Sequence, residues 1–166
     1  MSVVEEKFSA NFEETASAIK HRGAYYQEDA GEKGMALLEA KFKDTKLYWL
    51  VDVQEDRIFS ARFFAYGGKV SLVVGETLCT MVEGLTVEEA CSLLKTDVEA
   101  RLRDEPEVPS VPESRMKAFD TVEELLKIAR EQYPSAKGVA IASASIDKAD
   151  FQSTAELNLA AQAWLG

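Results

Sequence analysis

The chain is poor in the residue types that carry most metal and nucleophile chemistry. Among its 166 residues there are only two cysteines, Cys79 and Cys91, and one histidine, His21. The spacing of the thiols matches no compact metal-binding pattern, and His21 is far from both in sequence. One histidine in the N-terminal segment supports neither a Ser-His-Asp nor a Cys-His arrangement. We therefore expect a protein that is not an enzyme, with two reduced cysteines acting as small hydrophobes in helices.

The sequence also lacks long apolar runs and an excess of positive charge. No run is long enough to span a bilayer, and no charged-then-apolar leader follows Met1, so we expect a cytoplasmic protein without membrane contact. Lysine and arginine number 19 against 29 acidic residues, which gives a net charge of -10. Because phosphate binding depends on lysine and arginine, this balance argues against nucleic acid as a partner.

The first two thirds of the chain have the pattern of an α+β fold. Three β-rich runs, at 35–42, 47–53 and 57–67, are joined by short polar turns, which indicates an antiparallel sheet. Residues after Gly68 have helical spacing, and Thr86 and Glu89 form a capping box. A stripe of apolar residues within 3–20 predicts an amphipathic N-terminal helix, and its members are Val4, Phe8, Phe12, Ala16 and Ile19.

The last third contains a proline-rich loop and two predicted elements beyond it. Three of the four prolines fall in residues 103–115, which predicts an extended loop within a compact domain. A helix ending near Tyr133 follows it. The tail predicts an alternating strand at 139–146 and then a final helix. We therefore expect one domain over residues 1–134 and a strand–helix extension over 135–166 that packs on it.

Two phrases of this chain resemble one known family. "DRIFSARFFAYGG" followed by "MVEGLTVEEA" is similar to the IscU family, also called the NifU N-terminal domain, and the spacing between the phrases fits without a gap. The resemblance covers roughly residues 20–130 and is most specific from 57 to 98. It implies a small, mostly antiparallel three-stranded sheet packed against several helices. It also implies a scaffold on which iron–sulfur clusters are assembled.

The positions at which the family carries its three cluster cysteines hold other residues here. The resemblance places the first cysteine at Phe42 or Lys43 and the second at Gly68, next to Lys69. It places the third at Arg115, and Asp44 matches the aspartate that accompanies the first cysteine. Phenylalanine and glycine supply no ligand atom, and lysine and arginine add positive charge. We therefore expect no bound cofactor, although the family implies an iron–sulfur cluster or iron.

These observations favour one functional hypothesis and leave others open. The first is a degenerate scaffold that acts as a binding or regulatory module for a desulfurase, a chaperone or a related scaffold. The second is an iron or cluster carrier that uses Cys79 or Cys91 across an oligomer. The third is a small-ligand protein or enzyme that reuses the pocket near Asp44, Lys69 and Arg115. The turn Gly67–Gly68–Lys69 is either a tight turn or a weak anion site. The sequence leaves the oligomeric state open.

Overall fold

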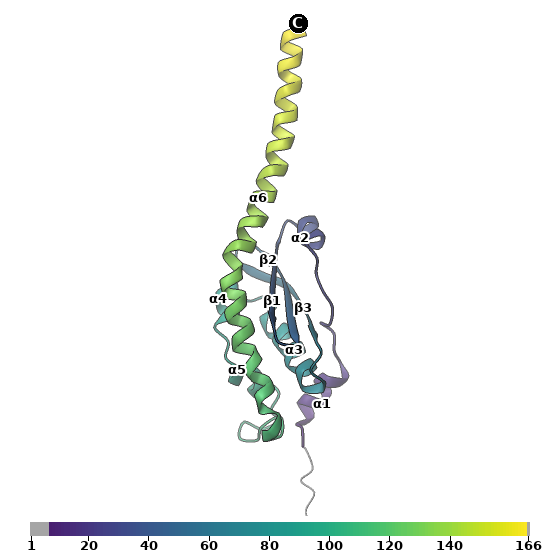
Figure 1. The fold of residues 1–166 in the computed structure, drawn as a ribbon, viewed down its shortest axis with the longest axis vertical. Helices are drawn as coiled ribbons and strands as arrows, with labels where there is room; N and C mark the ends of the chain where they lie inside the picture. The colour runs from purple at the N-terminus through teal and green to yellow at the C-terminus, as the bar shows by residue number, and fades with distance from the viewer. Residues whose placement is uncertain (1–6, 166) are drawn as a thin grey trace, which may run out of the picture.

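The computed structural model describes residues 7–165, with side chains as far as residue 144 (Figure 1). In this part of the chain three strands form one antiparallel sheet in the order β1-β2-β3. The strands are β1 Ala36–Phe42, β2 Thr45–Asp52 and β3 Arg57–Ala65. The predicted strands and the predicted α+β class are therefore confirmed.

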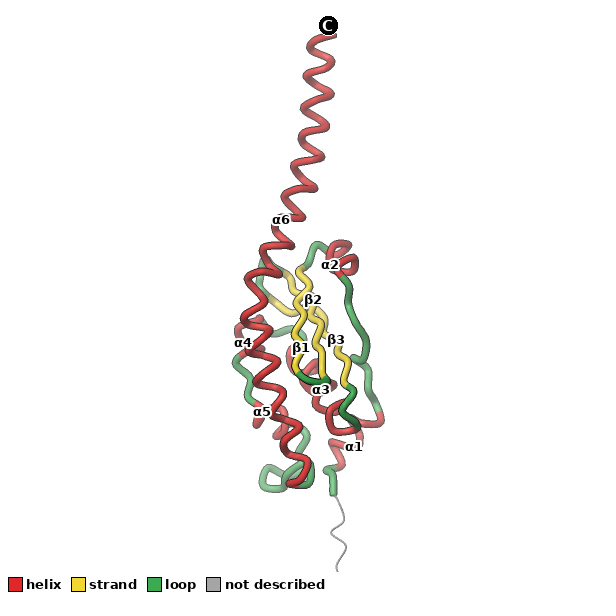
Figure 2. Tube along the Cα trace, viewed as in Figure 1, coloured by secondary structure: helices red, strands yellow, loops and turns green. Residues whose placement is uncertain are grey.

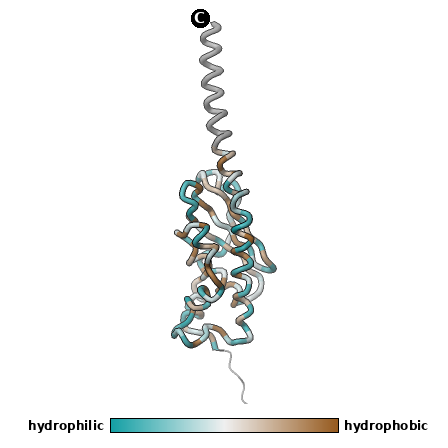
Figure 3. The backbone as a smooth tube through the Cα atoms, turned by 90° about the vertical axis from the view of Figure 1, so that its left-hand side faces the viewer, coloured by the Kyte–Doolittle hydropathy of each residue, from teal (hydrophilic) through white to brown (hydrophobic). Residues whose placement is uncertain are grey.

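Alternation along the strands gives the sheet one buried face. Trp49 of β2 lies opposite Leu38 of β1 and Ala61 of β3 in the register, and all three side chains are buried. Residues two apart point to the same face of a strand, so these alternating apolar positions form a continuous inner face. Hydrophobic and hydrophilic stretches are interspersed throughout the body of the molecule (Figure 3).

Helices cover the inner face of the sheet. The helix α3 lies along β3 and α6 lies along β1 (Figures 1 and 2). Within the described residues, no helix combines the length and the hydropathy needed to cross a bilayer. The helical segments are α1 Ala10–Ser17, α2 Gln27–Lys33, α3 Lys69–Val82, α4 Val87–Cys91, α5 Lys95–Arg101, the 3₁₀ helix η1 Glu113–Phe119, and α6 Asp120–Leu165.

The N-terminal helix is shorter than the apolar stripe predicts. It begins at Ala10 because the hydroxyl of Ser9 accepts from the N–H of Phe12 at 2.9 Å. The carboxylate of Asp104 accepts from the N–H groups of Ala10 and Asn11 at 2.7 and 2.9 Å, which satisfies two more of the first-turn donors. Phe12 is buried as predicted, whereas Val4 of the predicted stripe lies outside the described residues.

The strand predicted at 139–146 is wrong, because those residues belong to α6. Their alternation comes largely from alanine and serine, and alanine is the best helix former. Pro134 lies inside α6, although it removes one backbone donor. On either side of it, Tyr133 and Lys137 both donate to the carboxylate of Asp56 in the β2–β3 turn. The predicted boundary after residue 134 thus falls within a continuous helix, and the division into domain and extension stays a prediction.

Candidate functional site

The β1–β2 turn and the start of α3 meet at one end of the sheet. The backbone N–H of Tyr66 donates to the carbonyl of Asp44 at 3.1 Å. A Cβ added to Gly67 would lie 1.9 Å from a carboxylate oxygen of Asp44 and 2.6 Å from the hydroxyl of Ser71. Gly67 is therefore needed for close approach, and Asp44 is held directly beside the turn that precedes α3.

Gly68 adopts a backbone conformation that other residues avoid. Its φ of 101° and ψ of -167° lie in a region accessible almost only to glycine. A Cβ at this position would meet no atom within 4 Å, so space for a side chain is present. The backbone conformation, and not a lack of space, therefore favours glycine at position 68, where the resemblance places the second family cysteine.

The 3₁₀ helix η1 brings the third segment to the same end of the molecule. A pocket of about 430 Å³ lies between the β1–β2 turn and the start of α6. Phe42 and Lys43 line it from the turn, and Lys117 and Asp120 line it from η1 and α6. Arg115 also lies in η1, where its N–H donates to the carbonyl of Pro112 at 2.8 Å. Of the residues of η1, Lys117 lines this pocket and Arg115 does not. The assignment of Arg115 to the third family position stays a prediction.

The pocket is lined by charged groups of both signs. Lys95 donates to Asp120 at 2.8 Å, and this hydrogen bond lowers the pKa of Asp120 and raises the pKa of Lys95. The ammonium of Lys43 lies 5.4 Å from the centre of the Phe42 ring. Amino groups and an aromatic ring therefore line this pocket, and neither is a soft metal ligand.

Lys69 does not line this pocket. Its ammonium donates to both carboxylate oxygens of Glu13 in α1, each at 2.7 Å, and lies 5.0 Å from the centre of the Phe8 ring. Lys69 therefore links α1 to the start of α3. The lysine of the Gly-Gly-Lys turn is already paired, so the turn alone is a weak candidate for anion binding.

Neither cysteine is available at the surface as a thiolate. Cys79 lies in α3 with no exposed surface, and burial together with the charges of Glu76 and Glu83 raises its pKa well above the usual value. Cys91 ends α4 and is partly buried, and burial raises its pKa to about 11. Metal ligation and sulfur transfer both require the thiolate. Among residues with described side chains, no three His, Cys, Asp or Glu groups are placed to hold a metal ion.

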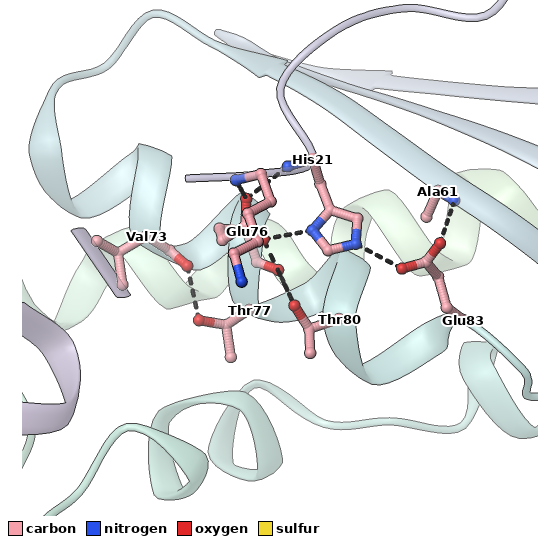
Figure 4. A network of polar contacts seen from close by, with 8 residues as sticks. His21, Ala61, Val73, Glu76, Thr77, Thr80 and Glu83 are labelled. Carbon is pink, nitrogen blue, oxygen red and sulfur yellow. Dashed lines mark hydrogen bonds and ion pairs between the residues drawn. The ribbon is translucent and has the colours of Figure 1, made fainter. Parts of the chain in front are cut away.

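A polar network around His21 was not anticipated from the sequence (Figure 4). The two ring nitrogens of His21 are bonded to the carboxylates of Glu76, within α3, and Glu83, the residue that follows α3. Burial alone would lower the pKa of His21, but the hydrogen bonds and charges of the two glutamates outweigh it and raise the pKa. The sequence did contain one indication of this network, because Glu76 is an acidic residue among the apolar residues of α3.

The carboxylate of Glu76 also holds the backbone of the segment that runs beside β3. It accepts from the N–H groups of Lys20 and His21 at 2.6 and 2.7 Å. The segment then pairs with β3, since the N–H of Phe63 donates to the carbonyl of His21 at 3.0 Å. The network therefore closes the exposed edge of β3 and has a structural role.

The structure is thus an α+β fold in which the β1–β2 turn, the start of α3 and η1 lie at one end of the sheet. A sequence model of the family described as NifU-like N terminal domain matches residues 17–146, which is most of the chain. No curated protein matches the chain.

Two solved structures are similar to this chain at low sequence identity. A protein from Fervidobacterium islandicum AW-1, described as an iron–sulfur cluster assembly scaffold for the SUF system, is 18% identical. The match covers 74% of this chain and 95% of that chain, with a TM-score of 0.48. The N-terminal part of a nitrogen-fixing NifU-like protein from Brucella abortus is 14% identical, over 81% of this chain and 88% of that chain, with a TM-score of 0.39. From the family match, the chain belongs to the NifU-like N-terminal domain family of iron–sulfur cluster assembly scaffolds.

Proposed function

We propose that this protein is a scaffold-family member that no longer holds a cluster and acts as a binding or regulatory module in iron–sulfur cluster assembly. The observation that carries the proposal is the replacement of ligands in a site that keeps its three segments together. The residues at the three family positions are Phe42 at the β1–β2 turn, Gly68 before α3 and Arg115 in η1, and none of them is a cysteine. We further propose that it works in the cytoplasm with protein partners of the assembly machinery.

The chemistry of these residues supports the loss of the cluster. Iron–sulfur clusters are held by thiolates, and neither a phenyl ring nor a glycine offers a donor atom. The positively charged side chains of Lys43 and Lys117 would repel ferrous iron. The backbone of Gly68 adds a second barrier, because a cysteine at φ 101° would be strained by about 1–3 kcal/mol.

A carrier that uses its own cysteines across an oligomer is less well supported. Cys79 is part of the hydrophobic core, so it would have to leave the core to meet a second chain. Cys91 alone would give one thiol per chain, and its raised pKa keeps it protonated at neutral pH. The structure gives no specific observation that favours this alternative.

The first test measures iron and acid-labile sulfide per chain after anaerobic reconstitution with ferrous iron and sulfide. We expect substoichiometric iron and no visible absorption from a cluster after desalting. A cluster that survives desalting in stoichiometric amount would overturn the proposal. The variants Cys79→Ala and Cys91→Ala then identify the ligand, because a true thiolate site is lost in one variant.

The second test asks for the partner. The tagged protein, purified under native anaerobic conditions from its own cells, is expected to bring a desulfurase, a chaperone or another scaffold with it. Each candidate is then purified and titrated against the protein in the absence of iron. The binding role is rejected when no assembly protein co-purifies, or when binding is seen only after iron is added.

A further inference from the structure

The outer face of the sheet is open at the end near the β1–β2 turn. At the other end of this face Leu50 is fully buried, and α2 lies close to the strands there (Figure 1). At the turn end, Tyr66 is 77% exposed, and Tyr48 and Phe64 are only partly buried. One half of the face is therefore covered by the chain itself, and the other half is left to solvent.

Three aromatic side chains form a row on this open half. The rings of Tyr48 and Phe64 meet edge to face with centroids 6.4 Å apart, and the rings of Phe64 and Tyr66 are nearly parallel with centroids 6.3 Å apart. Exposed aromatic residues are costly to leave in water and are enriched at the centres of protein interfaces. The row therefore has the composition of a contact surface.

Lysines surround the aromatic row. An open pocket of about 260 Å³ lies beside it, with three lysines and one acidic residue among its lining residues. We call this surface the basic aromatic patch and define it by Lys41, Lys43, Lys46, Tyr48, Phe64 and Tyr66.

The charge of the patch is opposite to that of the whole chain. Lys46 is paired with Glu39 at 3.1 Å and lies 4.8 Å from the centre of the Tyr48 ring. Lys41 and Lys43 are exposed, and Asp44 is turned toward Gly67. A local excess of positive charge on a chain of net charge -10 selects for a partner surface of negative charge.

We propose that the basic aromatic patch docks an acidic segment of a partner protein, which places carboxylates against Lys41 and Lys43 and an apolar side chain against Phe64 and Tyr66. The inference rests on the proposed binding role and names its contact surface. A nucleic-acid strand is the other polyanion that lysines and aromatic rings attract. A nucleic-acid strand carries a phosphate at every nucleotide and is bound through lysines or arginines along its length. The patch offers only three lysines beside its aromatic row, so the observations favour the short acidic segment.

The experiment uses a short fluorescein-labelled peptide of Asp and Glu with one central Trp as the probe. Controls are a peptide with Lys in place of every acidic residue and an oligothymidylate of the same length. Fluorescence anisotropy with the full chain is expected to show binding of the acidic peptide that weakens as salt rises, no binding of the lysine peptide, and weaker binding of the oligonucleotide.

Paired variants locate the contact. The double variant Lys41→Glu/Lys43→Glu is expected to weaken peptide binding by about tenfold or more, because attraction becomes repulsion. The matched control Arg101→Glu/Lys127→Glu makes the same change in net charge at exposed positions on α5 and α6, and is expected to retain most binding. Tyr66→Ala is expected to weaken binding severalfold, whereas Tyr26→Ala, 69% exposed at the start of α2, is expected to leave it unchanged.

Three outcomes overturn the inference. They are failure of the acidic peptide to bind the unmodified protein, equal loss in both double variants, and tighter binding of the oligonucleotide than of the peptide. Iron and sulfide are measured on the same preparations. A cluster found there contradicts the proposed function, whereas the peptide titrations test the patch alone, so the two failures are distinguishable.

Discussion

The charged residues of this protein behave differently in its interior and at the end of its sheet. In the interior, the carboxylates of Glu76 and Glu99 are almost fully buried, and each accepts several hydrogen bonds. At the sheet end, Lys41, Lys43 and Lys117 are exposed and line two neighbouring pockets that share Lys43. Buried charge is tolerated only when the fold satisfies it, so the interior networks maintain the structure, and the sheet end is left for contacts with other molecules.

The carboxylate of Glu99 shows how fully a buried charge is hydrogen-bonded in this fold. Its carboxylate accepts from Nε of Arg103 at 2.7 Å, and from the N–H and hydroxyl of Ser110 at 3.1 and 2.8 Å. Burial would raise the pKa of Glu99, but the bonds from Arg103 and Ser110 outweigh it and lower the pKa. The proline-rich loop is thereby tied to α5, which confirms that it is a loop of a compact domain.

The largest expected effect comes from removing a buried carboxylate. Glu99→Ala leaves the guanidinium of Arg103 and the polar groups of Ser110 without their acceptor, and should lower the free energy of unfolding by about 3 kcal/mol. Glu88→Ala is the matched control, because Glu88 is exposed and its pair with Arg130 is at the surface. It should change the free energy of unfolding by less than about 1 kcal/mol. Urea denaturation measures the free energy of unfolding of both variants. Equal losses would contradict the distinction between the buried and the exposed carboxylate.

A second effect tests the packing between α3 and β3. A Cβ at Gly75 would lie 2.3 Å from the ring of Phe63, which is fully buried, so Gly75→Ala should lower the free energy of unfolding by about 1–3 kcal/mol. Gly138 lies in α6 with no atom within 4 Å of an added Cβ. Gly138→Ala should therefore raise helix stability by up to about 1 kcal/mol. Thermal unfolding of the two variants checks this, because the melting temperature should fall in Gly75→Ala and rise in Gly138→Ala.

A third effect concerns pH. The folded-state pKa of His21 is raised above its ordinary value of 6.5, so its contribution to stability is complete below pH 6.5 and is lost as pH rises through the folded pKa. The melting temperature of the unmodified protein should fall over this window. His21→Gln should be less stable at low pH and should lack this fall. A fall of equal size in the variant would assign the titration to another group.

The smallest effect is expected at the sheet end. Lys43→Ala and Lys117→Ala remove exposed ammonium groups that line the pocket, and each should change the free energy of unfolding by less than about 0.5 kcal/mol. Denaturant midpoints close to that of the unmodified protein would sharpen the contrast with Glu99→Ala. A loss as large as that of Glu99→Ala would show that these lysines belong to the structural interior instead.

Local patterns predicted the parts of the fold that local physics controls. The three strands follow from apolar alternation, and the capping box forms as expected, with the N–H of Thr86 donating to Glu89 at 3.0 Å and the N–H of Glu89 donating to Thr86 at 3.2 Å. The strand prediction for 139–146 failed because alternation of alanine with larger residues is compatible with a helix. In the structure these residues simply extend α6.

The candidate site was predicted in chemistry but not in full geometry. Phe42 and Gly68 were identified from the resemblance, and no fold can give those residues a thiolate. The sequence did not indicate that Lys117 lines a pocket with Phe42, because the position of η1 relative to the β1–β2 turn depends on contacts far apart in sequence. His21 was missed for the same reason, since 55 residues separate it from Glu76.

The sequence by itself determined the three strands, the capping box and the absence of cysteines at the family positions, because these depend on residue type and short-range spacing. The tertiary structure alone decided which polar groups are buried together and which are left at the surface. It placed His21 between Glu76 and Glu83 and fixed Gly68 in a conformation that disfavours cysteine. It also gathered Lys41, Lys43 and Tyr66 on the open half of the sheet. Burial and long-range pairing arise only when the whole chain packs, and no short stretch of residues specifies them.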